Sequence, residues 1–191
     1  DPSGNLIFTG STTLIAQANV IDLGDSFSAG TGTVIFAGSG VDQNVPKGSA
    51  PYYNLSIANS GGAGAVQSNV GISALSVSNN LIINEGSAFK TAEAGCQVSG
   101  NVYNDGLFTI YGTGITVSGS FSTSSSSANV VYAGTSDNST VNVFATTYSN
   151  LSVDNDNTDF YCGGPLTVSN NMHIQAGRLL NDSHDLTLSG N

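Results

Sequence analysis

Residues 75–102 read LSVSNNLIINEGSAFKTAEAGCQVSGNV, and this stretch decides the fold. It contains one short pattern twice, at 77–81 and at 98–102: an apolar residue, three small polar residues and a second apolar residue. Similar apolar positions recur along the chain with spacings of 20, 21, 19 and 20 residues. They are Ile57, Val77, Val98 and Val117, and then Val168 with Leu188. This period predicts a structure built from coils of about 20 residues.

Between these corners, apolar and polar residues alternate, as in residues 109–111 (TIY), 151–153 (LSV) and 166–168 (LTV). Alternation with a period of two is typical of a strand with one buried face. Clusters of Asn, Gly and Ser, such as residues 59–62 and 104–106, are expected to supply the positive φ of tight corners. Because one coil cannot bury its own apolar side chains, the coils must stack around a continuous core.

We therefore predict an all-β protein that is one continuous parallel β-solenoid, or parallel β-helix, of about ten coils over residues 1–191. The general chirality of parallel crossovers predicts right-handed coils. At about 4.8 Å per coil, the protein would be a rod about 48 Å long.

A longer repeat contains the short one, because three segments return after 96, 96 and 91 residues. They are 34–38 (VIFAG, then VVYAG at 130–134), 54–57 (NLSI, then NLSV at 150–153) and 75–80 (LSVSNN, then LTVSNN at 166–171). The triplet SGN also recurs at 3–5, 99–101 and 189–191. These matches predict two repeats, 3–98 and 99–190. Two tandem immunoglobulin-like sandwiches are the alternative, since each has about 100 residues, but no linker separates the repeats.

The composition limits the partners. Only 8% of residues are charged, against about 25% in typical soluble domains, and 13 acidic against 3 basic residues give a net charge of −10. This charge repels nucleic acid and anionic lipid. No apolar run approaches the roughly 18 residues that span a bilayer, so we expect no membrane insertion. The opening Asp1-Pro2, without Met or a signal peptide, is expected for a mature or excised segment of an exported protein.

The series Val-x-Phe/Tyr-Ala-Gly, Tyr-x-Asn-Leu-Ser-Ile/Val and Leu-x-Val-Ser-Asn-Asn covers essentially the whole chain. It resembles the tandem-repeat segments of large exported bacterial surface proteins, the adhesin-like and haemagglutinin-like parallel β-helices. The resemblance implies a non-catalytic extracellular structural protein, either a repeat of a surface stalk or adhesin or a self-assembling filament subunit. Its partners would be copies of itself or flanking repeats, joined end to end.

The alternative function is a module that binds carbohydrate or a receptor on a host or cell surface. Its site would depend on calcium or be lined by tyrosines, of which Tyr52, Tyr53, Tyr148 and Tyr161 are the candidates. Tyr52 and Tyr148 recur 96 residues apart, which also fits a structural role.

Residues 154–159 (DNDNTD) form the densest acidic cluster. Asp154, Asp156 and Asp159 offer the hard oxygen ligands that Ca²⁺ prefers, and calcium is the only cofactor that the sequence suggests. However, Asp159 stands where a helix-loop-helix calcium loop needs glycine, and no Glu follows at its twelfth position. A solvated turn is the other interpretation of this cluster.

Catalytic chemistry has little support in the sequence. Residues 183–185 (Ser-His-Asp) contain the letters of a hydrolase triad, but neighbours on a strand point to opposite faces and cannot form the required hydrogen-bond chain. The chain has only two glutamates, Glu85 and Glu93, and its aspartates are scattered. We therefore expect that the protein is not an enzyme.

Two further residue types suggest covalent modification. Asn-x-Ser/Thr sequons at Asn54, Asn138, Asn150 and Asn181 are candidate glycosylation sites of an exported surface.

Cys96 and Cys162 lie 66 residues apart. That separation is about three coils, or roughly 14 Å, which is too far for an in-chain disulfide. We predict that both thiols are free or linked between molecules.

Overall fold

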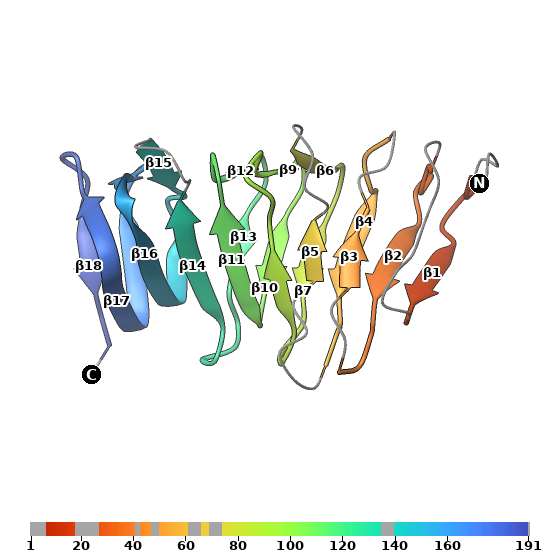
Figure 1. The fold of residues 1–191 in the computed structure, drawn as a ribbon, viewed down its shortest axis with the longest axis horizontal. Coiled ribbons are helices and arrows are strands. Elements are labelled where there is room, and N and C mark those ends of the chain that lie inside the picture. The colour runs from red at the N-terminus through yellow and green to blue at the C-terminus, as the bar shows by residue number, and fades with distance from the viewer. Residues whose placement is uncertain are drawn as a thin grey trace.

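The computed structural model (Figure 1) describes residues 7–17, 27–40, 43–46, 50–60, 66–68, 74–134 and 140–190. Through these residues the chain winds as a parallel β-solenoid of about seven turns. The named strands pair only in parallel, which excludes the sandwich alternative because immunoglobulin-like sheets are antiparallel. Within this part of the chain, no helix has the length and apolar character needed to cross a bilayer.

The strands form three parallel sheets, which we call the first, second and third face. The first face contains β1 (Thr13–Ala16), β2 (Thr33–Phe36), β4 (Asn54–Ile57), β7 (Leu81–Ile83), β10 (Val102–Asn104) and β13 (Phe121–Ser122). The second contains β3 (Gln43–Val45), β5 (Val66–Ser68), β8 (Ala88–Lys90), β11 (Leu107–Tyr111) and β14 (Asn129–Gly134). The third contains β6 (Leu75–Val77), β9 (Cys96–Val98) and β12 (Ile115–Val117).

Toward the C-terminus the strands lengthen and run around the corners (Figure 1). The chain there forms β15 (Thr140–Val143), β16 (Thr147–Cys162), β17 (Leu166–Leu180) and β18 (Leu186–Leu188), all of which join the sheet of the second face. Register shifts between Tyr148 and Asn150, and again between Val153 and Asp159, mark where β16 turns from one face to the next. The start of β16 continues the first face, since the Tyr148 ring lies 5.6 Å from that of Phe121.

The predicted coil period holds over part of the chain only. Val77 pairs with Val98, Val98 with Val117, and Val168 with Leu188, as their spacing predicts. Ile57 does not belong to this series: it pairs with Ile83, 26 residues later, while Val77 pairs with Tyr52. Extra residues between β4 and β6 lengthen that coil. The prediction of ten coils is therefore too high, and the observed seven turns extend about 34 Å.

The second repeat is turned by one face relative to the first. Val34 and Leu55 lie on the first face, but their counterparts Val130 and Leu151 pair with each other on the second. Four coils after Val34, the first-face position is occupied by Phe121. Val130 comes nine residues after Phe121, which is far enough along the coil to reach the second face. A repeat of 96 residues therefore spans about four and a third coils. The same sequence can occupy different faces because each face needs the same alternation of buried and exposed residues.

Inward side chains of successive coils stack into one core that runs along the solenoid. Val34, Leu55, Leu81 and Val102 follow one another in register and are fully buried. Phenyl rings form a second column, in which Phe108 stacks 5.6 Å from Phe89 and 6.4 Å from Phe121. Burial of such side chains contributes about 1.5–3 kcal/mol each, so the core is the main source of stability.

Hydrogen bonds between asparagines hold the corners of neighbouring coils together. The Asn79 amide donates to Asn54 Oδ1 (2.9 Å), and Asn171 donates in the same way to Asn150 Oδ1 (2.9 Å). The backbone N–H and the hydroxyl of Ser120 both donate to Asn101 Oδ1, each at 2.9 Å. These side chains therefore form a polar ladder beside the apolar one.

The expected positive φ at residues 104–106 is absent, whereas residues 61 and 62 of the other cluster lie outside the described residues. Gly106 is needed for space instead, since a Cβ atom there would lie 2.4 Å from the Ser87 carbonyl oxygen. Gly112 does have positive φ (72°), and its Cβ atom would overlap the backbone of Glu93 on the preceding coil. Close approach between coils thus selects glycine as strongly as backbone conformation does.

Substitution at two neighbouring positions of β11 tests which side chains of this strand face the core. Phe108 is fully buried, while the Leu107 side chain is 40% exposed on the outer surface. We expect Phe108→Ala to lower the free energy of unfolding by about 3–5 kcal/mol, and Leu107→Ala to lower it by less than about 1 kcal/mol. Urea denaturation followed by circular dichroism measures both. Equal losses would contradict the assigned strand alternation.

Candidate functional site

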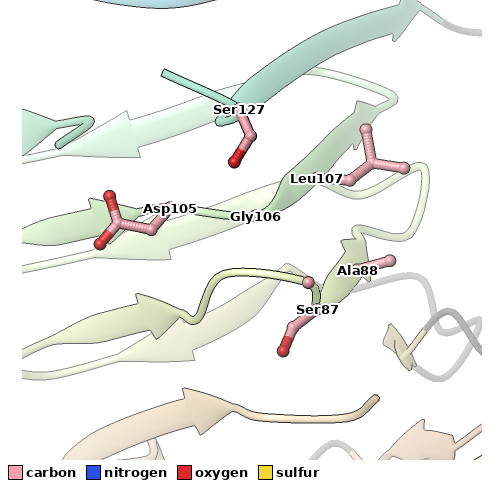
Figure 2. Close-up of a pocket in the computed structure, with 7 residues that line it drawn as sticks. Ser87, Ala88, Asp105, Gly106, Leu107 and Ser127 are labelled. Atoms are coloured by element: carbon pink, nitrogen blue, oxygen red, sulfur yellow. The ribbon is translucent and has the colours of Figure 1, made fainter. Parts of the chain in front are cut away.

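The described surface holds an open depression with both polar and apolar walls, of about 330 Å³ (Figure 2). Three successive coils line it: Ser87 and Ala88 with Gly86 on the first, residues 105–107 on the next and Ser127 on the third. Leu107 supplies its apolar part, and Figure 2 shows the Asp105 carboxylate on another side. Gly86 leaves space at this corner between the first and second faces, since a Cβ atom there would meet no atom within 4 Å.

Two carboxylates beside this depression bind the serine run that follows β13. Asp105 Oδ1 accepts hydrogen bonds from the Ser124 hydroxyl (2.7 Å) and from the backbone N–H groups of Ser124 (2.8 Å) and Ser125 (2.9 Å). Glu85 Oε1 accepts from the hydroxyls of Ser125 (3.4 Å) and Ser127 (3.2 Å). Hydrogen bonds from Ser124 and Ser125 lower the pKa of Asp105, against a smaller opposing effect of burial.

This arrangement is suited to holding a corner of the solenoid in place. A general acid needs a pKa raised toward neutrality, whereas Asp105 is held ionised. The lining contains no histidine, aromatic ring or cationic side chain. This cluster is not among the sites predicted from the sequence, although the sequence contains a signal for it: Asp105 and Glu85 precede Ser125 by 20 and 40 residues, one and two coil lengths.

The acidic cluster of residues 154–159 lies within β16, not in an isolated turn. Asp159 forms a two-point ion pair with Arg178 of β17, with N–O distances of 2.8 and 2.6 Å. The Asn155 amide donates to the Ala133 carbonyl (2.8 Å) on the preceding coil. No group of three potential metal ligands is found in the described part of the chain. The structure therefore does not gather Asp154, Asp156 and Asp159 into a calcium site.

Residues 183–185 lie in the turn between β17 and β18, so the Ser-His-Asp triplet occupies a polar corner. Asp182 and Ser183 have positive φ (43° and 71°), and the His184 N–H donates to the Asn181 carbonyl (2.8 Å). The triplet thus forms part of a largely exposed corner between two parallel strands of the last described coil.

Two of the four tyrosines proposed as a glycan surface belong to the core. Tyr52 and Tyr148 are fully buried. The Tyr148 hydroxyl donates to the Phe144 carbonyl (2.8 Å), and Tyr52 donates to the Pro46 carbonyl, so in both repeats the ring anchors the segment before it. Burial raises the pKa of both hydroxyls. Tyr53 and Tyr161, which are only partly buried, remain the accessible pair.

The sequons differ in accessibility. The Asn150 amide nitrogen, to which a glycan would attach, donates to the carbonyls of Ser126 (2.8 Å) and Ala128 (2.9 Å). Asn54 is partly buried in the asparagine ladder, and Asn181 is exposed in the terminal turn. Asn138 lies outside the described residues. Of the described sequons, Asn181 is therefore the most accessible to modification.

Both cysteines are buried free thiols, with 1% exposure for Cys96 and 3% for Cys162. Cys96 pairs with Leu75 and Ile115 on the neighbouring coils, whereas Cys162 pairs with Val143, so the thiols belong to different coils. Burial raises the pKa of Cys96 to about 12 and also raises that of Cys162. Disulfide exchange needs an accessible thiolate, and neither residue offers one in this conformation.

Comparison with known proteins adds no assignment: no family matches the chain, and neither a curated protein nor a solved structure gives a match.

The asparagine ladder can be tested with two sequon residues that differ in environment. Asn150→Ala removes hydrogen bonds to two backbone carbonyls and to Asn171, so we expect the free energy of unfolding to fall by about 1–3 kcal/mol. Asn181→Ala, in the exposed turn, should change it by less than about 0.5 kcal/mol. Thermal and urea unfolding provide the comparison. If Asn150→Ala were neutral, the ladder would have no energetic role.

Thiol labelling tests the burial of the cysteines. We expect no reaction of the native protein with a maleimide or an aromatic disulfide reagent, and two reactive thiols per chain after denaturation. The native molar mass should be the same with and without reductant. A dimer that disappears on reduction would instead support the intermolecular linkage.

Proposed function

We propose that this chain is a non-catalytic extracellular structural protein, a repeat of a surface stalk or adhesin or a subunit of a self-assembling filament. The observation that carries the proposal is the continuous core, which runs from Ala16 in β1 to Val168 in β17. A parallel solenoid of this kind is stiff along its axis because each coil contacts only its neighbours and all of them share one core. Such a rod separates or connects other parts without needing a site of its own.

The lateral surface supports the same function. Several of its carboxylates and amides are used within the protein: Asp105 and Glu85 bind serines, Asp159 binds Arg178, and Asn150 binds backbone carbonyls. The open depression beside Leu107 lacks the aromatic rings that sugars stack on. The scarcity of charge, with 8% charged residues, fits an exposed surface of hydroxyls and amides. The resemblance to exported surface repeats favours an extracellular location.

Two measurements on the purified chain distinguish this function from a calcium-dependent or glycan-binding module. We expect electron microscopy to show rods or end-to-end fibres of constant width. We also expect the unfolding temperature to be the same in Ca²⁺ and in a chelator, because Asp154 and Asp156 do not converge with Asp159, and an Asp154→Asn, Asp156→Asn double variant should behave like the wild type. Glycan binding, or a chelator effect that this variant abolishes, would overturn the structural function in favour of the binding module.

A further inference from the structure

The core of the solenoid is open at its C-terminal end. The last coil places apolar residues directly above buried ones, in strand register: Ile174 above Val153, Leu186 above Leu166 and Leu188 above Val168. The lower residues of these pairs are almost fully buried, yet the upper ones are 50%, 36% and 61% exposed. Their exposure therefore does not come from an outward orientation. They occupy core positions that the described chain does not cover.

The backbone at this end is also unpaired. β17 pairs with β18 only through residues 166–168, so its residues from Asn171 to Leu180 have a strand partner on the β16 side alone. β18 is the terminal strand of its sheet. An exposed strand edge next to an apolar layer is a template for the addition of another parallel strand.

We propose that this C-terminal coil docks the N-terminal coil of a second copy of the chain. The proposal rests on the proposed filament function and specifies its interface. The opposite end offers a complementary layer. β1 is the terminal strand of the first face, and both Leu14 in β1 and Phe8, which precedes β1, are only partly buried against the core. A second copy would therefore cover apolar core positions with apolar core positions.

The junction between the two repeats within the chain supplies the geometry. There, the coil that contains β10 stacks on the coil that contains β7, and Asn104 pairs with Ile83. Ile174 is the repeat counterpart of Ile83, 91 residues later, and Phe8 is the counterpart of Asn104, 96 residues earlier. By this relation, Phe8 of the second copy lies over Ile174 of the first. The interface repeats an internal contact, with Phe in place of the buried Asn.

The same relation fixes the rotation of the second copy. Ile174 lies on the second face, because its ladder runs back through β16 to Tyr132 in β14. Phe8 lies beside the third face of its own chain, since its ring packs against that of Phe27, which lies 5.4 Å from the ring of Tyr52 on that face. With Phe8 over Ile174, the third face of the second copy continues the second face of the first. The sequence pattern thus advances by one face at this junction, as it does between the two repeats within the chain.

The association can be tested by sedimentation velocity of the 191-residue chain over a range of concentrations. We expect the wild type to form head-to-tail oligomers, and Ile174→Lys and Leu188→Lys to raise the dissociation constant at least about tenfold, because each places a charge in the apolar layer. Leu107→Lys is the matched control, since Leu107 is 40% exposed on the lateral surface and should associate like the wild type. Circular dichroism shows whether each variant is folded.

Cross-linking between copies tests the register. A mixture of Phe8→Cys and Ile174→Cys chains should form a disulfide-linked dimer under mild oxidation, while neither variant alone should do so. Ile15→Cys replaces Phe8→Cys as a control, because Ile15 is 58% exposed but alternates with the inward residues of β1. A wild type that stays monomeric, or lysine variants that associate normally, would overturn this interface. Single rods in the electron microscope would then still support the stalk function.

Discussion

The structure depends on one constraint, which is that inward side chains of successive coils lie in strand register. Val77, Val98 and Val117 meet this constraint directly, and Phe89 and Phe108 meet it with stacked rings. A shift of one residue would turn every side chain of a strand to the opposite surface. The apolar column therefore fixes the register, and the backbone hydrogen bonds between parallel strands follow from it.

Polar residues serve the same constraint at the corners. Asn54, Asn101 and Asn150 connect one coil to the next, and Asp105 holds the serine run of the following coil. The buried hydroxyls of Tyr52 and Tyr148 bind carbonyls of the segments that precede them. Because these groups are hydrogen-bonded within the protein, they join neighbouring coils and add a polar contribution to the register that the apolar column sets.

The sequence predicts the class of fold, since alternation and the 20-residue period both follow from stacked strands. It does not predict the length of every coil: Ile57 has the right spacing from Val77, but the loop after β4 lets it pair with Ile83. The sequence also does not predict that Val34 and its counterpart Val130 lie on different faces, because the length of a sequence repeat need not equal a whole number of coils. For the site, spacing places Asp159 one coil from Arg178 and Asp105 one coil from Ser125, but it does not predict which side chains at facing corners bind each other.

The rotation between repeats has a consequence for any longer array. A repeat of four and a third coils extends the solenoid by about 21 Å along its axis. Each repeat is also rotated about this axis by about a third of a revolution relative to the repeat before it. An array of such repeats would present the same surface residue on the three faces in succession and return to the first after three repeats. Features such as the exposed turn at Asn181 would then follow a helical path around the rod rather than a line along it. A stalk built this way presents equivalent surfaces in all directions, although its individual coils have no symmetry.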